Sequence, residues 1–145
     1  MQLDHLRLPS LRMMHPNTQF VTPVGYVISG EGRRVYFPGD TDLFDEMEQL
    51  GDIDVAMLRI WGWGSTSGTG HLDPTSAATA TAAATGLIRP GIVVPIHLGT
   101  YAPEDGRRLP RWFDDPPEQF EQALADAGLS HFLHLLHPGE SMSVS

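Results

Sequence analysis

The chain has 145 residues, 41% of them hydrophobic, which fits one globular domain with a core of its own and excludes long disorder. The formal net charge is −9 and the nine Lys and Arg residues form no basic cluster, which argues against nucleic acid or an anionic membrane surface as a partner. Cysteine is absent, so disulfides and thiolate metal sites are excluded and any metal ion must be bound through His and Asp.

The N-terminal segment carries neither a clear strand signal nor a targeting signal. No basic stretch is followed by an apolar one, and no apolar run in the chain could span a bilayer, so we expect a soluble cytoplasmic protein. Asp4 and His5 are adjacent and could offer two ligands to one ion or to two neighbouring ions, although such pairs also occur at random on surfaces. His15 follows in a polar, proline-containing stretch that we expect to be loop.

A hairpin that runs into an acidic turn is the clearest feature of the chain. Strand formers on both sides of the glycine-rich residues 29–32 predict an antiparallel hairpin. Pro38-Gly39 ends the second strand, and Asp40 follows where a buried strand leaves a sheet, which is where α/β folds carry their chemistry. A carboxylate held there suits metal binding or general-base catalysis. The competing interpretation is that Asp40 and Thr41 only cap the short helix expected at 43–50.

Strands and helices alternate after this turn. Residues 55–58 are apolar throughout and predict a buried strand, which makes a βαβ-like crossover with the helix before it. A glycine-rich loop at residues 60–71 carries two tryptophans, which either line a pocket or close the edge of the core. Asp73 and Pro74 are the expected N-cap and first residue of an alanine-rich helix.

The last third again places a polar residue directly behind an apolar strand. Residues 92–96 predict a buried strand, and His97 follows it, although a lone histidine in such a place is more often structural than a ligand. Asp115 and Gly128 are expected to bound the final helix, and a strand at 132–136 closes the domain. Three further histidines would alternate between the two faces of that strand, so one ion could not collect them and we expect them to be exposed or structural: His131, His134 and His137.

These elements predict an α/β fold, with a mixed sheet and helices, in a single domain over residues 1–145. Four blocks, which cover most of the chain from Gly25 onward, resemble the C-terminal half of a metallo-β-lactamase-fold hydrolase, closest to its lactonase and phosphodiesterase-like branch. The resemblance implies half of an αββα sandwich and hydrolysis of a small-molecule lactone, ester or phosphodiester by a metal-activated water. The blocks are Gly25-Tyr26-Val27-Ile28, Val35-Tyr36-Phe37-Pro38-Gly39-Asp40-Thr41, Gly70-His71-Leu72-Asp73-Pro74 and Val94-Pro95-Ile96-His97-Leu98-Gly99-Thr100.

The resemblance also implies roles for individual residues. Asp40 would be the carboxylate that bridges two metal ions, and His97 would be the last histidine ligand. His71 would face the substrate or the metal centre, so that Asp40 and His71 are the expected catalytic residues. The tryptophan loop would line the pocket. The expected cofactor is one or two Zn²⁺ ions, with Mn²⁺ as the alternative.

The first 23 residues depart from the family pattern, while 24–145 correspond to the C-terminal half. The family carries a His-x-His-x-Asp-His motif, and here Gln2 stands where its second histidine should be, followed by Asp4 and His5 as second-site ligands. His15 is either the remaining histidine ligand or a loop residue. We therefore expect an N-terminally truncated and internally shortened domain, whose open sheet edge invites pairing of two copies.

Three hypotheses stay open from the sequence. About three protein ligands suffice for a catalytic zinc, so Asp4, His5, Asp40 and His97 could still hold one ion with an open position. Alternatively, the chain is a catalytically inactive remnant or interaction module of the same fold. A flavodoxin-like binding domain also fits the alternation of strands and helices, but no phosphate-binding glycine fingerprint follows the first strand.

Overall fold

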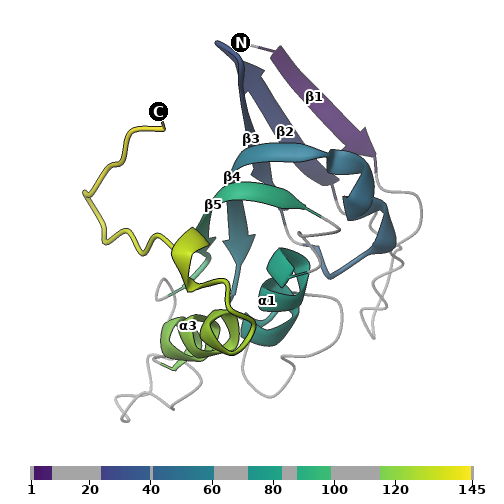
Figure 1. Cartoon of the computed structure of the whole chain (residues 1–145). Helices are drawn as coiled ribbons and strands as arrows, with labels where there is room; N and C mark the ends of the chain where they lie inside the picture. The colour runs from purple at the N-terminus through teal and green to yellow at the C-terminus, as the bar shows by residue number, and fades with distance from the viewer. Residues whose placement is uncertain are drawn as a thin grey trace, which may run out of the picture.

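In the computed structural model the described parts of the chain are residues 2–7, 24–39, 41–60, 72–82, 88–98 and 115–144. Their five strands form one sheet in the order β1-β2-β3-β4-β5, with two α-helices together on one of its faces (Figure 1). No helix in these ranges is long and apolar enough to cross a membrane. The strands are β1 (Gln2–Arg7), β2 (Val24–Gly30), β3 (Arg33–Phe37), β4 (Asp52–Arg59) and β5 (Arg89–Ile96). The helices are α1 (Pro74–Ala82) and α3 (Pro116–Asp126), with 3₁₀ turns η1 (Asp45–Leu50) and η4 (Ser130–Phe132).

Strand direction brings four strand ends to the same side of the sheet. β1 pairs with β2 and β2 with β3 in antiparallel fashion, whereas β3–β4 and β4–β5 are parallel pairs. β1, β3, β4 and β5 therefore all run in one direction. We call the side where these four strands end the carboxyl edge.

The predicted hairpin and crossover are confirmed. Gly30 pairs with Arg33, so β2 and β3 are joined by the two residues Glu31 and Gly32. Both have positive φ, 53° and 76°, as a type I′ turn requires, and this turn matches the twist of the strands beside it. The parallel pairing of β3 with β4 across η1 is the expected crossover.

The helices predicted from the sequence are confirmed in part. Asp73 caps α1, since its Oδ1 accepts a hydrogen bond of 2.7 Å from the backbone N–H of Ser76. Asp115 precedes α3 as expected but makes no side-chain cap bond. The helix expected at 43–50 is the 3₁₀ turn η1, in which Met47 and Leu50 are fully buried. Its short length suits the tighter 3₁₀ winding.

Two expectations about strands at the ends of the chain were wrong. The N-terminal segment forms β1, which the sequence hides because it lacks apolar alternation and is held by backbone pairing with β2. No strand covers 132–136: η4 is followed by a single bridge from Leu133 to Val93, and the chain beyond His134 makes no further ladder. The solvent exposure expected for the C-terminal histidines is confirmed for His131, His134 and His137.

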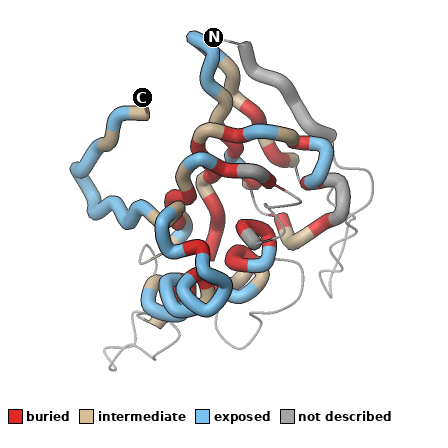
Figure 2. Tube along the Cα trace, viewed as in Figure 1, coloured by how far each residue is buried: buried red, intermediate tan, exposed pale blue. Residues whose placement is uncertain are grey.

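The core lies between the sheet and the helices. One cross-strand row, Tyr36, Ala56 and Val93, is buried there together with Phe120 and Leu124 of α3 (Figure 2). The next row along the strands points to the opposite face, and it too is apolar: Val35, Val55 and Ile92. The sheet is therefore apolar on both faces, as in sheets that are covered on both sides.

Polar contacts fix the amino ends of β3 and β4. Asp54 Oδ1 pairs with Arg33 Nη1 at 2.9 Å, and its Oδ2 accepts the backbone N–H of Arg34 at 2.7 Å. Arg34 Nη1 donates to the carbonyls of Leu50 and Asp52 at 2.7 and 2.8 Å. The side-chain hydrogen bond from Arg33 has the largest effect and the backbone hydrogen bond from Arg34 the next largest, and together they hold the pKa of Asp54 below its ordinary value.

A tight glycine contact fixes the other end of β3. Gly39 has φ +65°, and a Cβ at this position would fall far inside van der Waals contact with the carbonyl oxygen of Val24. Gly25 is also closely approached: a Cβ there would lie 3.3 Å from Tyr36 Cε2 and 3.4 Å from the Pro38 carbonyl oxygen. The turn that leaves β3 thus lies directly on the first two residues of β2.

We expect Asp54→Asn to lower the free energy of unfolding by about 1 kcal/mol at pH 7, because the amide loses the ion pair and one of two acceptor oxygens. The lowered pKa of Asp54 means that its stabilisation is present above the ordinary carboxyl pKa and is lost as the pH falls through the folded-state value. The pH dependence of unfolding below about pH 4 should therefore be flatter in the variant. Urea unfolding at several pH values measures both effects, with exposed Glu121→Gln as control. If the free energy of unfolding depended on pH below about pH 4 as strongly in Asp54→Asn as in the wild type, the stabilising role assigned to the Asp54 carboxylate would be wrong.

Gly39→Ala should destabilise the fold by about 2 kcal/mol or more, since both the positive φ and the contact with a backbone carbonyl oppose a Cβ. Gly128→Ala is the matched control: Gly128 has φ +72° but open space around it, so only the conformational cost of about 1 kcal/mol applies. Chemical unfolding of the two variants compares them directly. Equal losses would show that the Val24 contact contributes nothing.

Candidate metal centre

The Asp40 turn lies at the carboxyl edge, immediately after β3. Asp40 itself is outside the described residues, but Gly39 and Thr41 on either side of it are described. The backbone carbonyl of Thr41 accepts a hydrogen bond of 3.0 Å from the N–H of Leu72. Leu72 directly follows His71 in the sequence. The residues that directly follow Asp40 and His71 are therefore in backbone contact.

His97 leaves the sheet at the same edge, directly after β5. Its φ is +60°, a left-handed conformation that few residues other than glycine and asparagine adopt, and its side chain is exposed. Such strained residues cluster at functional sites. β4 separates β3 from β5, so the chain leaves the sheet toward Asp40 and His97 at points about 10 Å apart at ordinary strand spacing.

Asp4 and His5 belong to β1, the edge strand at the opposite end of the sheet from β5. They are the residues of β1 that pair with Val27 and Tyr26, and only their backbone is described. β1 and β5 are the outermost strands, about 19 Å apart at ordinary spacing. His5 and His97 therefore lie at opposite ends of the carboxyl edge, with the end of β3 between them.

The donor chemistry at this edge fits a divalent ion. Carboxylate and imidazole groups are ligands of Zn²⁺ and Mn²⁺, and the fold directs three of the segments that carry them to one edge. Within the described ranges no three His, Asp or Glu side chains form a cluster that could hold an ion. Three of the expected site residues, with the tryptophan loop, lie outside those ranges: His15, Asp40 and His71.

Two buried hydroxyls lie beside the Asp40 turn. Tyr36 and Thr41 are almost completely inaccessible to solvent. Burial raises the pKa of Tyr36, and a side-chain hydrogen bond with Thr41 offsets part of that rise.

A buried cation completes this region. Arg59 is the last residue of β4 and is 1% exposed, and its partner in the ladder is Ile96, which directly precedes His97. Burial lowers the pKa of Arg59 to about 10. Arg59 was not singled out in the sequence analysis, and the signal that could have found it is a charged residue directly after the apolar run 55–58.

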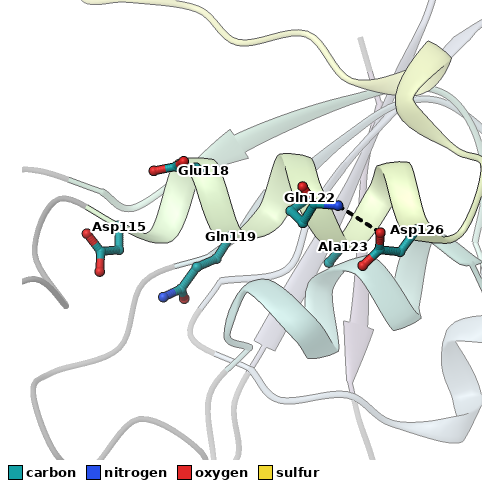
Figure 3. Close-up of a pocket in the computed structure, with 6 residues that line it drawn as sticks. All are labelled: Asp115, Glu118, Gln119, Gln122, Ala123 and Asp126. Carbon is teal, nitrogen blue, oxygen red and sulfur yellow. Dashed lines mark hydrogen bonds between the residues drawn. The ribbon is translucent and has the colours of Figure 1, made fainter.

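A surface hollow among the described residues lies elsewhere. A cavity of about 460 Å³ follows the outer side of α3, where Gln122 Nε2 donates to Asp126 Oδ1 at 2.7 Å (Figure 3). None of the expected site residues lines it, and all of its lining comes from one helix and the residue before it. We therefore place the candidate site at the carboxyl edge. The cavity is lined by Asp115, Glu118, Gln119, Gln122, Ala123 and Asp126.

Comparison with known proteins agrees with this geometry. Residues 1–98 match the model of the beta-lactamase superfamily domain. A UPF0173 metal-dependent hydrolase of Methanopyrus kandleri is 37% identical over 123 residues, which are 83% of this chain and 45% of that protein. One from Thermus thermophilus is 36% identical over 122 residues, or 81% and 44%. The chain thus spans about half the length of these relatives.

A solved structure supports the fold. The metallo-beta-lactamase fold protein YhfI of Bacillus subtilis superposes with a TM-score of 0.53, over 80% of this chain and 42% of that protein, at 15% identity. The mixed sheet with helices expected from the sequence is thus the arrangement found in that fold. On the family match and the solved structure together, the chain belongs to the beta-lactamase superfamily and has the metallo-beta-lactamase fold.

Proposed function

We propose that this chain is a metal-dependent hydrolase whose site lies at the carboxyl edge. The observation that supports the proposal is the Thr41–Leu72 hydrogen bond, which joins the residues that follow Asp40 and His71, together with the end of β5 at His97 on the same edge. The relatives named metal-dependent hydrolases support the same reaction class.

Each residue has a distinct role in this proposal. Asp40 and His97 are metal ligands, and β3, the strand that precedes Asp40, lies between β5, which precedes His97, and β1, which carries Asp4 and His5. Because β1 and β5 are far apart, we assign that pair to a second ion on the other side of Asp40. His15 is the remaining candidate ligand of this second ion.

The proposed cofactor is one or two Zn²⁺ ions, with Mn²⁺ as the alternative. When bound, such an ion lowers the pKa of a water molecule and polarises the carbonyl or phosphoryl group to be cleaved. His71, on the segment beside Asp40, faces the substrate and holds or transfers a proton.

The proposed substrate is a small molecule with a lactone, ester or phosphodiester bond. Loops and pocket shape select the substrate in such folds. The residues proposed at the carboxyl edge therefore support hydrolysis as the reaction class, and the loops determine which of these bonds is cleaved. A cytoplasmic location and pairing of two copies through an open sheet edge stay predictions.

Metal content should distinguish this proposal from an inactive module. Protein loaded with Zn²⁺ or Mn²⁺ is expected to retain about one or two ions per chain by elemental analysis. Asp40→Ala should remove most of the metal, because it takes away the shared ligand, and His97→Ala should remove at least one ion. Exposed His134→Ala is the matched control and should retain the metal of the wild type.

The assignment of a second ion has its own variant. His5→Ala should reduce two ions to one while leaving the ion held by Asp40 and His97. If the wild type retains no more metal than an Asp40→Ala/His97→Ala double variant, the hydrolase proposal is wrong and the chain is the inactive module. If metal is retained, hydrolysis of lactones, esters and phosphodiesters is the next measurement.

A further inference from the structure

The face of the sheet that points away from α1 and α3 is apolar over two successive rows. Side chains alternate between the two faces of a strand, so the residues two positions beyond Val35, Val55 and Ile92 share the face of that row. The six side chains of this outer face are Val35, Phe37, Val55, Met57, Ile92 and Val94. None of them is charged, although the chain has a formal net charge of −9. The charge of the chain therefore does not interrupt this surface.

The outer face is buried at its centre and open around it. Val55 and Val94 are 6% and 7% exposed, yet neither belongs to the cluster of core residues that packs with the helices. Val35 and Met57 are half-buried, and Phe37 is 36% exposed. Both α-helices of the described ranges lie on the opposite face (Figure 1). A contiguous apolar surface of this kind marks a site of interaction with another protein surface.

An apolar segment extends this surface beyond β5. Leu133 is joined to Val93 by a parallel bridge, so the chain lies beside β5 at this point. Leu135 and Leu136 follow and are 43% and 38% exposed. We call residues 135–144 the C-terminal arm, and Figure 2 shows that most of it is exposed. The apolar surface thus continues from the last strand of the sheet into the first two residues of the arm.

The length of the relatives indicates what covers the outer face. The match covers 45% of the Methanopyrus kandleri protein and 44% of the Thermus thermophilus one, so two copies of this chain hold about as many residues as one relative. An uncharged, apolar sheet face is also complementary to itself about a two-fold axis, which is the commonest symmetry of protein dimers. Contact between two outer faces would cover each sheet on both sides, as its two apolar faces require.

We propose that the outer face packs against the outer face of a second copy of this chain, and that the C-terminal arm of each copy contacts the other. Helices, sheet, sheet and helices would then follow one another as layers. Three strands form a small contact, so we expect a dimer that depends on concentration and not a permanent one. The contact requires no metal ion, so this inference does not rest on the proposed function. It also differs from the pairing of sheet edges, which would leave the outer face unused.

The test measures self-association of the metal-free chain in EDTA by sedimentation velocity. Over about 1 to 200 µM, a range suited to weak complexes, the wild type should change from monomer to dimer. Phe37→Glu places a charge in the contact and should weaken association about 10-fold or more. Gln119→Glu adds the same charge on the exposed side of α3, so this matched control should associate as the wild type does.

Two further variants separate the face from the arm and from the stability of the fold. Val35→Thr keeps the β-branched shape of the side chain and should weaken association several-fold, so it tests the face even where Phe37→Glu does not fold. A Leu135→Ser/Leu136→Ser double variant changes exposed residues only and should also weaken association. The melting temperature of each variant at the lowest concentration shows whether its monomer is folded.

Two results would overturn the inference. If the wild type stays monomeric at every concentration, a second copy does not cover the outer face. If a dimer forms but the folded face variants associate as the wild type does, the copies pair elsewhere, as at a strand edge. Unchanged association of the double variant alone would remove the arm from the interface. Because all of these measurements use metal-free protein, none of them depends on whether the chain binds Zn²⁺, and the proposed function is tested separately.

Discussion

The contact between Gly39 and the backbone of Val24 is the constraint on which the candidate site depends. Because residue 39 is a glycine and has no Cβ, the chain can leave β3 by a turn in close contact with the start of β2. Asp40 directly follows this turn, after the end of β3. Thr41 then enters the core and accepts the hydrogen bond from Leu72. The contact between Thr41 and Leu72 follows from this path.

The parallel strands supply the second requirement, which is a common edge. A parallel pair needs a crossover connection, so β3, β4 and β5 all end on the same side of the sheet. Apolar rows on both faces of the sheet fit a layered fold in which each face is covered. That arrangement agrees with the match to the metallo-β-lactamase fold of YhfI, of which the superposition covers 42%.

Local signals predicted the elements that local physics determines. The I′ turn at Glu31 and Gly32, the Asp73 cap of α1 and the apolar run of β4 are all set by neighbouring residues. β1 was missed because pairing with a distant strand, not its own pattern, makes it a strand. For the same reason Asp40 and His97 could be singled out as strand-end residues, while the distance of β1 from β5 could not be predicted, because strand order is a tertiary property.

The polar residues buried in this protein are distributed unevenly, and that distribution argues for function. Within the described ranges, Thr81 satisfies its hydroxyl inside α1, whereas Tyr36, Thr41 and Arg59 are all on or next to the strands that end at the candidate site. Each opposes folding, because a phenol, a hydroxyl and a guanidinium lose contact with water when they are buried. Packing alone would place apolar side chains at all three positions. Because proteins break such rules mainly where chemistry requires it, three such residues beside one edge support the proposal that the site lies there.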